Sequence, residues 1–231
     1  MPRVSLEFSP LISNICAMEI ERILTILQEE KSKWQDDTLN VFQKTPFLIL
    51  IGGILSHRTK DKTTRAILEK LSQIAPNPES LLAIPEERLV ELIYPVGFYR
   101  RKAVTLRHVA QILVEKYHGQ VPQSLEELLS LPGVGRKTAN LVLSVAFNKP
   151  AICVDTHVHR IVNRWGYVQT KNPEETEKAL REKLPVAYWI PLNHLLVVFG
   201  QNVCLPLRPR CLACPVEKYC PKVGVQKQES P

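Results

Sequence analysis

Apolar residues recur at helical spacing along most of this chain, and this periodicity constrains its fold more than any other feature. Four residues at the i, i+3, i+4, i+7 spacing of one helix face are Ile20, Ile23, Leu24 and Leu27. Thr45 and Pro46 supply a capping hydroxyl and a first-turn proline ahead of the apolar segment 47–55. Further helices are expected over residues 61–73, 86–93, 100–117, 124–130, 136–147, 156–165, 173–183 and 190–200. Alternating strand patterns are nearly absent, so we predict an all-α fold of short helices joined by tight turns.

The chain is basic and has an ordinary globular composition. Its 231 residues include 30 Lys and Arg against 23 Asp and Glu, and the net charge of +7 indicates a polyanionic partner. No segment approaches the roughly 18 consecutive apolar residues of a membrane-spanning helix, which favours nucleic acid over a membrane as that partner. The N-terminus lacks the charged start and apolar block of a secretory signal, so we expect a protein of the cell interior.

The segment 131–140, Leu-Pro-Gly-Val-Gly-Arg-Lys-Thr-Ala-Asn, separates two predicted helices. Its glycines allow backbone angles that other residues resist, and they leave amides uncovered at Gly133, Val134 and Gly135. Such amides at a helix N-terminus bind phosphate through hydrogen bonds and the helix dipole. A plain helix–helix turn explains the glycines equally well, but Arg136 and the lysine after it favour a phosphate-binding hairpin.

Lys137 is a candidate nucleophile. A lysine attacks carbon only as the neutral amine, whereas an unperturbed lysine with a pKa of ~10.4 is almost wholly protonated at pH 7. Lys137 falls in the first turn of a predicted helix and beside Arg136, so the helix dipole and the neighbouring cation both disfavour its ammonium form. A neutral amine there suits Schiff-base formation. The alternative is a simple phosphate contact, which residue chemistry alone favours.

Asp155 follows the apolar residues 152–154 and precedes a predicted helix. Aspartate is a common helix N-cap, worth roughly 1 kcal/mol. Its carboxylate also suits stabilisation of a developing positive charge, or proton transfer to or from Lys137. The structural and the chemical role are compatible with each other.

Four of the six cysteines fall close to the C-terminus, at Cys204, Cys211, Cys214 and Cys220. Soft thiolates in fours suit either zinc or an iron–sulfur cluster. Structural zinc modules usually carry two short Cys pairs, whereas this loop has one Cys-x-x-Cys flanked by single cysteines. Arg208 and Arg210 lie between the first two cysteines, where they either contact a nucleic-acid backbone or are simply solvated.

Three of these features together resemble the endonuclease III family of DNA glycosylases. The hairpin 131–139, the segment Val-Asp-Thr-His at 154–157 and the cysteine spacing of x6, x2 and x5 are similar to that family's motifs and occur in its order. The resemblance covers residues 14–222. It implies a 4Fe-4S cluster on the four cysteines, Lys137 as the nucleophile and Asp155 as its catalytic partner.

The resemblance also implies an architecture and a reaction. Two helical domains, 39–149 and 1–38 plus 150–231, are expected to enclose a DNA-binding cleft. The expected activity is that of a bifunctional glycosylase and AP lyase, which excises oxidised pyrimidines and cleaves the strand by β-elimination. Its partner is double-stranded DNA with damaged bases or abasic sites, and the protein is expected to be a monomer, cytoplasmic and nucleoid-associated.

Two segments are candidates for filling the space that an extruded base leaves. Leu-Ser-His-Arg-Thr-Lys-Asp at 55–61 is similar to the family's Leu-Ser-x-Gln-x-x-Asp, but Arg58, preceded by His57, stands where the family has glutamine. This departure leaves the lesion range and the opposite-base preference open. Phe98 matches the family's apolar wedge position, and ordinary core packing is the equal alternative for it.

Two rival functions remain. A related mismatch glycosylase is disfavoured because its thymine-specific and adenine-specific branches typically lack the lysine, and because Gly52 and Gly53 stand where the adenine branch has a carboxylate. A non-catalytic iron–sulfur DNA-binding protein is disfavoured because both Lys137 and Asp155 are present.

Overall fold

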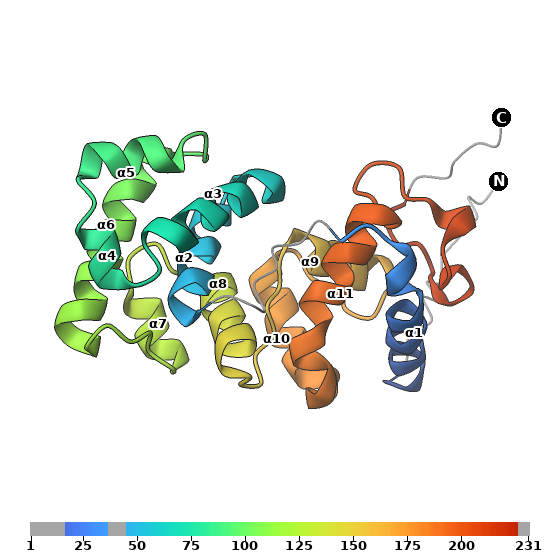
Figure 1. The fold of residues 1–231 in the computed structure, drawn as a ribbon. Coiled ribbons are helices and arrows are strands. Elements are labelled where there is room, and N and C mark those ends of the chain that lie inside the picture. Colours follow the sequence, from blue (N-terminus) through green and yellow to red (C-terminus); the bar gives the residue numbers. More distant parts are fainter. Residues whose placement is uncertain (1–16, 37–44, 226–231) are drawn as a thin grey trace, which may run out of the picture.

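The computed structural model describes residues 17–36 and 45–225, and within these ranges every regular element is helical, which confirms the predicted all-α fold (Figure 1). The α-helices are α1 (Ala17–Glu30), α2 (Pro46–Ser56), α3 (Asp61–Ile74), α4 (Pro78–Leu82), α5 (Glu86–Ile93), α6 (Tyr99–Tyr117), α7 (Leu125–Ser130), α8 (Arg136–Leu141), α9 (Thr156–Arg164), α10 (Pro173–Lys183) and α11 (Trp189–Asn202). Short 3-10 turns are η1 (Lys31–Lys33), η4 (Val186–Tyr188), η5 (Cys211–Ala213) and η6 (Glu217–Tyr219).

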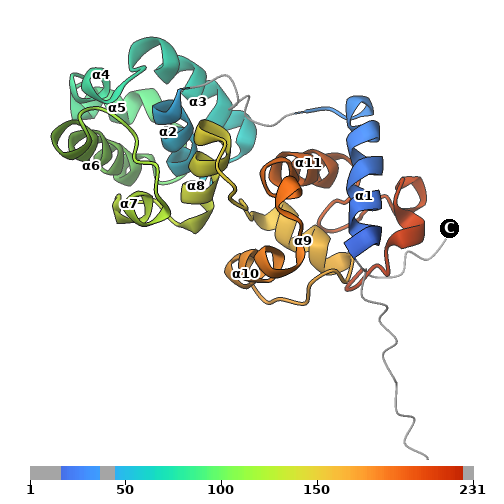
Figure 2. The same ribbon diagram turned by 90° about the horizontal axis from the view of Figure 1, so that it is seen from below.

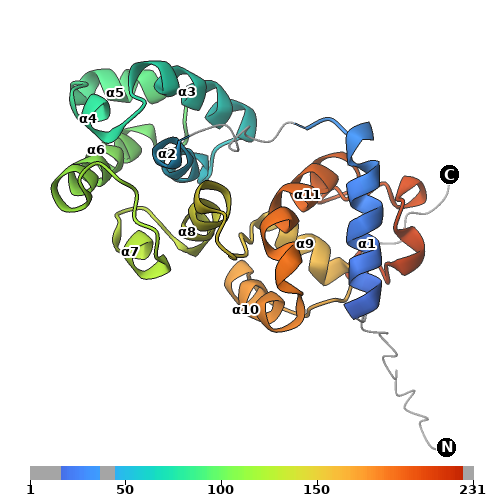
Figure 3. The ribbon, with the colours of Figure 1, turned by 60° about the horizontal axis from the view of Figure 1, so that its bottom comes forward.

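The helices gather into two lobes (Figure 2). The first lobe holds α2 to α8, and its core is drawn from residues between Phe47 and Ala151. The second lobe holds α9 to α11, the cysteine loop and α1, which packs against α11 although it begins the described chain (Figure 3). Apart from four residues of α1, its core begins at Ile152, directly after Ala151, the last core residue of the first lobe. The domain boundary expected between residues 38 and 39 lies outside the described ranges.

Helix α2 is the centre of the first lobe. Thr45 caps it, because its side chain accepts a hydrogen bond from the Leu48 amide. Every residue from Phe47 to Leu55 is buried, as expected of a helix that is apolar on all sides. Gly53 brings α2 close to α8, since a side chain there would collide with Thr138. The fixed position of α2 thereby fixes the start of α8.

Two helical features differ from the sequence-based expectation. Helix α4 was not predicted, although Asn77 caps it and Pro78 opens it, because five residues are too few to show a periodicity. The helix expected over 136–147 changes after Leu141 into the π-helical η3 (Val142–Ala146). The Ser144 hydroxyl donates to the Asn140 carbonyl at 2.8 Å, and this bond competes with the regular backbone pattern.

Candidate active site and DNA-binding surface

The hairpin between α7 and α8 presents its two glycines to solvent. Gly133 has a φ of +75°, and a side chain there would also collide with Thr105 on α6, so this position requires glycine. No described residue accepts a hydrogen bond from the amides of Gly133 or Gly135. Val134 differs, because its side chain is buried and its amide donates to the Leu131 carbonyl at 3.2 Å. The uncovered amides of the hairpin are therefore those of the glycines.

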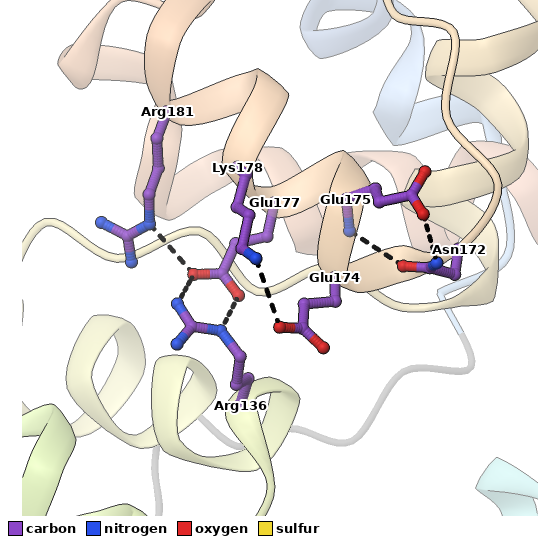
Figure 4. Close-up of polar contacts among 7 residues, drawn as sticks. All are labelled: Arg136, Asn172, Glu174, Glu175, Glu177, Lys178 and Arg181. Atoms are coloured by element: carbon purple, nitrogen blue, oxygen red, sulfur yellow. Dashed lines mark hydrogen bonds and ion pairs between the residues drawn. The ribbon is translucent and has the colours of Figure 1, made fainter.

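Arg136 does not point freely from the hairpin, as the sequence suggests, but is held by Glu177 of α10 (Figure 4). Its Nε and Nη2 donate to the two carboxylate oxygens at 2.9 and 2.7 Å, and Arg181 adds a third hydrogen bond at 3.0 Å. Hydrogen bonding to Glu177 raises the pKa of Arg136. Burial acts to raise the pKa of the Glu177 carboxyl, but the two guanidinium groups outweigh burial and lower it. This ion pair joins the first lobe to the second.

Lys137, the next residue, is exposed and lines a pocket of about 230 Å³. The first lobe contributes Arg136 and Lys137 to this pocket, and the second contributes Val154, Glu174 and other residues. The nucleophile predicted from the sequence therefore lies at the junction of the two lobes.

Asp155 caps α9 as predicted, because its Oδ1 accepts hydrogen bonds from the amides of His157 and Val158, both at 2.9 Å. Burial lowers the pKa of the His157 imidazole, Asp155 acts to raise it, and Lys137 acts to lower it. Asp155 and Lys137 also act in opposite directions on the buried thiol of Cys153. Both candidate catalytic residues thus lie within electrostatic range of the same two side chains.

The structure brings the two candidate gap-filling segments together. Phe98 is 60% exposed, which rules out the core-packing alternative. The Arg58 guanidinium lies over its ring, 5.8 Å from the centroid. His57 is exposed beside them, and its pKa is lowered by burial and by the charges of Lys102, Arg58 and Lys137. These residues therefore lie on the Lys137 side of the first lobe.

The four C-terminal cysteines line one small pocket at the far end of the second lobe. Burial raises the pKa of the Cys214 thiol to about 12, so a bound cation is needed to hold this sulfur as a thiolate. Arg164, the last residue of α9, donates to the Cys204 sulfur at 3.3 Å and to the Leu205 carbonyl at 2.7 Å. Within residues 17–36 and 45–225 no compact His, Cys, Asp or Glu cluster forms a single-ion site. The sulfur donor set and the shared pocket fit a cluster, and Arg208 and Arg210 are exposed beside it.

Sequence reasoning missed two residues that organise the site. Glu177 lies in a helix rich in charges, and nothing in its sequence context separates it from its solvated neighbours. Lys102 follows two arginines in α6 and reads as part of a basic surface, yet it is 7% exposed. Its one signal is its place three residues after an apolar position, Tyr99, on the helix face that enters the core.

Comparison with known proteins defines the class of this fold and site. Residues 51–186 match the family described as HhH-GPD superfamily base excision DNA repair protein. The chain is 51% identical to endonuclease III of Thermotoga maritima over 175 residues, which cover 76% of this chain and 82% of that protein. It is 41% identical to endonuclease III of Bacillus subtilis, over 76% of this chain and 80% of the relative.

Solved structures agree with these relatives. A trapped covalent endonuclease III–DNA intermediate superimposes with a TM-score of 0.80 at 34% identity, covering 89% of this chain and 96% of that one. A thermostable thymine-DNA glycosylase superimposes with a TM-score of 0.77 at 26% identity, covering 89% and 94%. The chain belongs to the endonuclease III family, whose members are DNA glycosylases and AP lyases of base excision repair. Among the described helices, none combines the length and apolar character needed to cross a bilayer.

Proposed function

We propose that this chain excises oxidised pyrimidines from duplex DNA through a Schiff base on Lys137 and then cleaves the strand by β-elimination. The observation that carries this proposal is the position of Lys137 and Asp155. Lys137 lies in the first turn of α8 in the first lobe, Asp155 caps α9 in the second, and the charges of both shift the pKa of the His157 imidazole. An exposed lysine at a pocket between the lobes is accessible to a nucleotide extruded from the duplex.

The reaction follows from the chemistry of these two groups. The neutral Nζ of Lys137 attacks C1′ of the deoxyribose, and the glycosidic bond breaks with its electron pair leaving on the base. The C1′–O4′ bond then opens with its electron pair leaving on O4′, which takes up a proton, while the lone pair of Nζ forms the double bond of the Schiff base to C1′. A nearby proton acceptor removes a C2′ proton, and the electrons of that C–H bond move toward C3′. The C3′–O3′ bond then breaks with its electron pair leaving on the 3′ phosphate. Water hydrolyses the Schiff base and restores Lys137.

Asp155 has two tasks in this scheme. Its Oδ1 is held by two backbone amides, so the carboxylate is fixed at the start of α9. Its negative charge stabilises the cationic sugar as the base departs and assists proton transfer at Lys137. A carboxylate that is already oriented needs no rearrangement in the transition state.

The DNA duplex is bound by surfaces on both lobes in this proposal. The amides of Gly133 and Gly135 donate hydrogen bonds to a backbone phosphate, while Arg136, tied to Glu177, holds the hairpin in place. His57, Arg58 and Phe98 fill the space left by the extruded base, with Arg58 donating hydrogen bonds to the unpaired partner base. Arg208 and Arg210 contact phosphates from the second lobe.

The cysteine loop carries the proposed cofactor. Cys204, Cys211, Cys214 and Cys220 would hold a 4Fe-4S cluster, which the shared pocket and the all-thiol donor set support. When bound, the cluster would compensate the negative charge of the four thiolates and would crosslink the loop. We assign residues 39–149 and 1–38 plus 150–231 as the two domains, and we propose a monomer.

Borohydride trapping tests the proposed function. Wild-type protein is incubated with duplex DNA that carries thymine glycol or an abasic site, beside Lys137→Gln and the exposed control Lys116→Gln. We expect covalent adducts on both substrates for wild type and control, and none for Lys137→Gln. Adducts on the abasic site alone would remove the oxidised-pyrimidine assignment, and adducts with Lys137→Gln would remove Lys137 as the nucleophile. Alkali cleavage of a thymine–guanine mismatch duplex after incubation tests the mismatch alternative, because base release without a Schiff base leaves an alkali-labile abasic site.

A further inference from the structure

A buried lysine that the proposed reaction does not use lies beneath the gap-filling residues. Lys102 of α6 is 7% exposed, and its Nζ donates to the carbonyls of Leu55 and His57 at 2.8 and 2.6 Å. It also donates to the Thr59 hydroxyl at 3.1 Å. The Leu55 carbonyl belongs to the last turn of α2, and the other two acceptors belong to the turn between α2 and α3, so one ammonium group directs its three N–H donors at the end of α2 and the turn that follows it.

The Thr59 hydroxyl connects this turn to a second one. The Gly97 amide, in the turn between α5 and α6, donates to Thr59 Oγ1 at 3.1 Å. Gly97 also touches the carbonyl oxygen of Arg58 so closely that a side chain could not be added there. Lys102, Thr59 and Gly97 therefore hold the two turns against each other. We call these three residues the turn clamp.

The turn clamp supports a strained backbone on both sides. Arg58 and Phe98 have φ values of +53° and +58°, in the left-handed region that disfavours residues with side chains. Such conformations persist where the surrounding structure holds them, and they concentrate at functional sites. Here they aim the Arg58 guanidinium and the exposed Phe98 ring at one another, 5.8 Å apart. The two side chains form one projecting unit with contributions from both turns.

The partners of Lys102 are unusual for a buried charge. Buried lysines are rare and are normally paired with a carboxylate. All three groups that Lys102 contacts are neutral oxygens, and burial lowers its pKa to about 8. An apolar side chain would fill this space without that electrostatic penalty, so the ammonium is expected to serve a purpose other than stability.

We propose that Lys102 is a positioning residue for base extrusion, because the turn clamp presents Arg58 and Phe98 to the DNA as one preorganised unit. This inference rests on the proposed function, in which these two side chains replace the extruded base. Without the clamp, each turn must be ordered separately as the duplex opens, and extrusion slows. Cleavage at an existing abasic site needs no base extrusion and depends far less on the clamp.

The variant Lys102→Met tests the proposal, with Lys116→Met at an exposed position of the same helix as the control. Under single-turnover conditions we expect Lys102→Met to excise thymine glycol paired with adenine about 10- to 100-fold more slowly than wild type. β-Elimination at a preformed abasic site should change by less than about threefold. Excision of thymine glycol placed opposite an abasic site should be largely restored, because an unpaired base costs less to extrude.

A fluorescent base gives a direct view of the extrusion step. With 2-aminopurine opposite the lesion, the fluorescence rise on binding should be slower for Lys102→Met than for wild type. Thr59→Val removes the hydroxyl of the turn clamp with little change in shape. It should slow excision of the paired lesion selectively, by a smaller factor than Lys102→Met. This variant tests the proposal if Lys102→Met fails to fold.

Three results would overturn the proposal. Equal losses of excision and β-elimination would indicate general damage to the site, and no loss of either would show that the clamp is dispensable. An undiminished defect on the unpaired lesion would place Lys102 at a step other than extrusion. If the wild-type protein itself does not excise thymine glycol, both the proposed function and this inference are wrong. If the wild-type protein does excise it and any of the three results is found, only the inference about Lys102 is wrong.

Discussion

Replacing Glu177 by glutamine removes the charge that ties the hairpin of the first lobe to α10 of the second. The Glu177 side chain is 3% exposed and accepts three hydrogen bonds from Arg136 and Arg181, at 2.7, 2.9 and 3.0 Å. Removing one partner of a buried ion pair typically costs about 3–5 kcal/mol, because the remaining charge is left uncompensated. The arginine side chains are 35% and 31% exposed and can turn toward water, so we expect about 3 kcal/mol.

The assay is chemical and thermal unfolding followed by circular dichroism. For a protein of this size a loss of about 3 kcal/mol corresponds to a melting temperature lower by roughly 6–12 °C. Glu174→Gln is the matched control, since Glu174 lies on the same helix, is 61% exposed and contacts Lys178 at 3.5 Å. Its loss should stay below about 1 kcal/mol. Unfolding free energies of the two variants that agree within about 0.5 kcal/mol would refute the reasoning.

The same carboxylate predicts a pH dependence. Burial acts to raise the pKa of Glu177, but hydrogen bonds from the two arginines outweigh it, so the folded-state pKa lies below the ordinary value of 4.5. The unfolded chain therefore takes up this proton first as the pH falls. The stabilisation is fully present above pH 4.5 and is lost as the pH falls through the folded-state pKa. Glu177→Gln should reduce this acid sensitivity.

Three further changes test the proposed roles of single residues. Asp155→Asn keeps an N-cap but removes the charge, so excision should fall about 100-fold with little loss of stability. Asp155→Ala should also lose about 1 kcal/mol of stability in denaturant unfolding. An active Asp155→Asn would contradict the role of the charge. Cys214→Ser should lower bound iron, measured by metal analysis, and DNA affinity, measured by anisotropy; unchanged iron would exclude this ligand. Arg208→Gln and Arg210→Gln should each reduce the slope of log affinity against log salt by about 1, and a wild-type slope would place these arginines away from phosphate.

The helices were predictable because their signals are local. A cap, a first-turn proline and an apolar face lie within a few residues of one another, and 173–183 is an example in which the predicted and observed bounds agree. The four cysteines and the glycine hairpin were equally visible, because each motif is contiguous. Helix α4 was missed because capping residues without a following periodicity are also common in turns.

The contacts that organise the site were not predictable from the same signals. Glu177 lies 41 residues after Arg136, and the His57 carbonyl lies 45 residues before Lys102. A charged residue gives no indication in sequence of which distant oxygen it will meet, so Arg136 was expected to face phosphate. Phe98 was compatible with core and surface alike, and only the folded structure, in which it is 60% exposed, decides for the surface.

Helix α9 begins at the Asp155 carboxylate and ends at Arg164, which is bound to the cysteine loop. Its nine residues span about 13 Å at 1.5 Å per residue. This helix is therefore a short, rigid connection with one end at the candidate active site and the other at the cysteine loop. A shift of the cysteine loop along the axis of α9 is therefore delivered to the carboxylate as a rigid translation, with no flexible linker between them to absorb it.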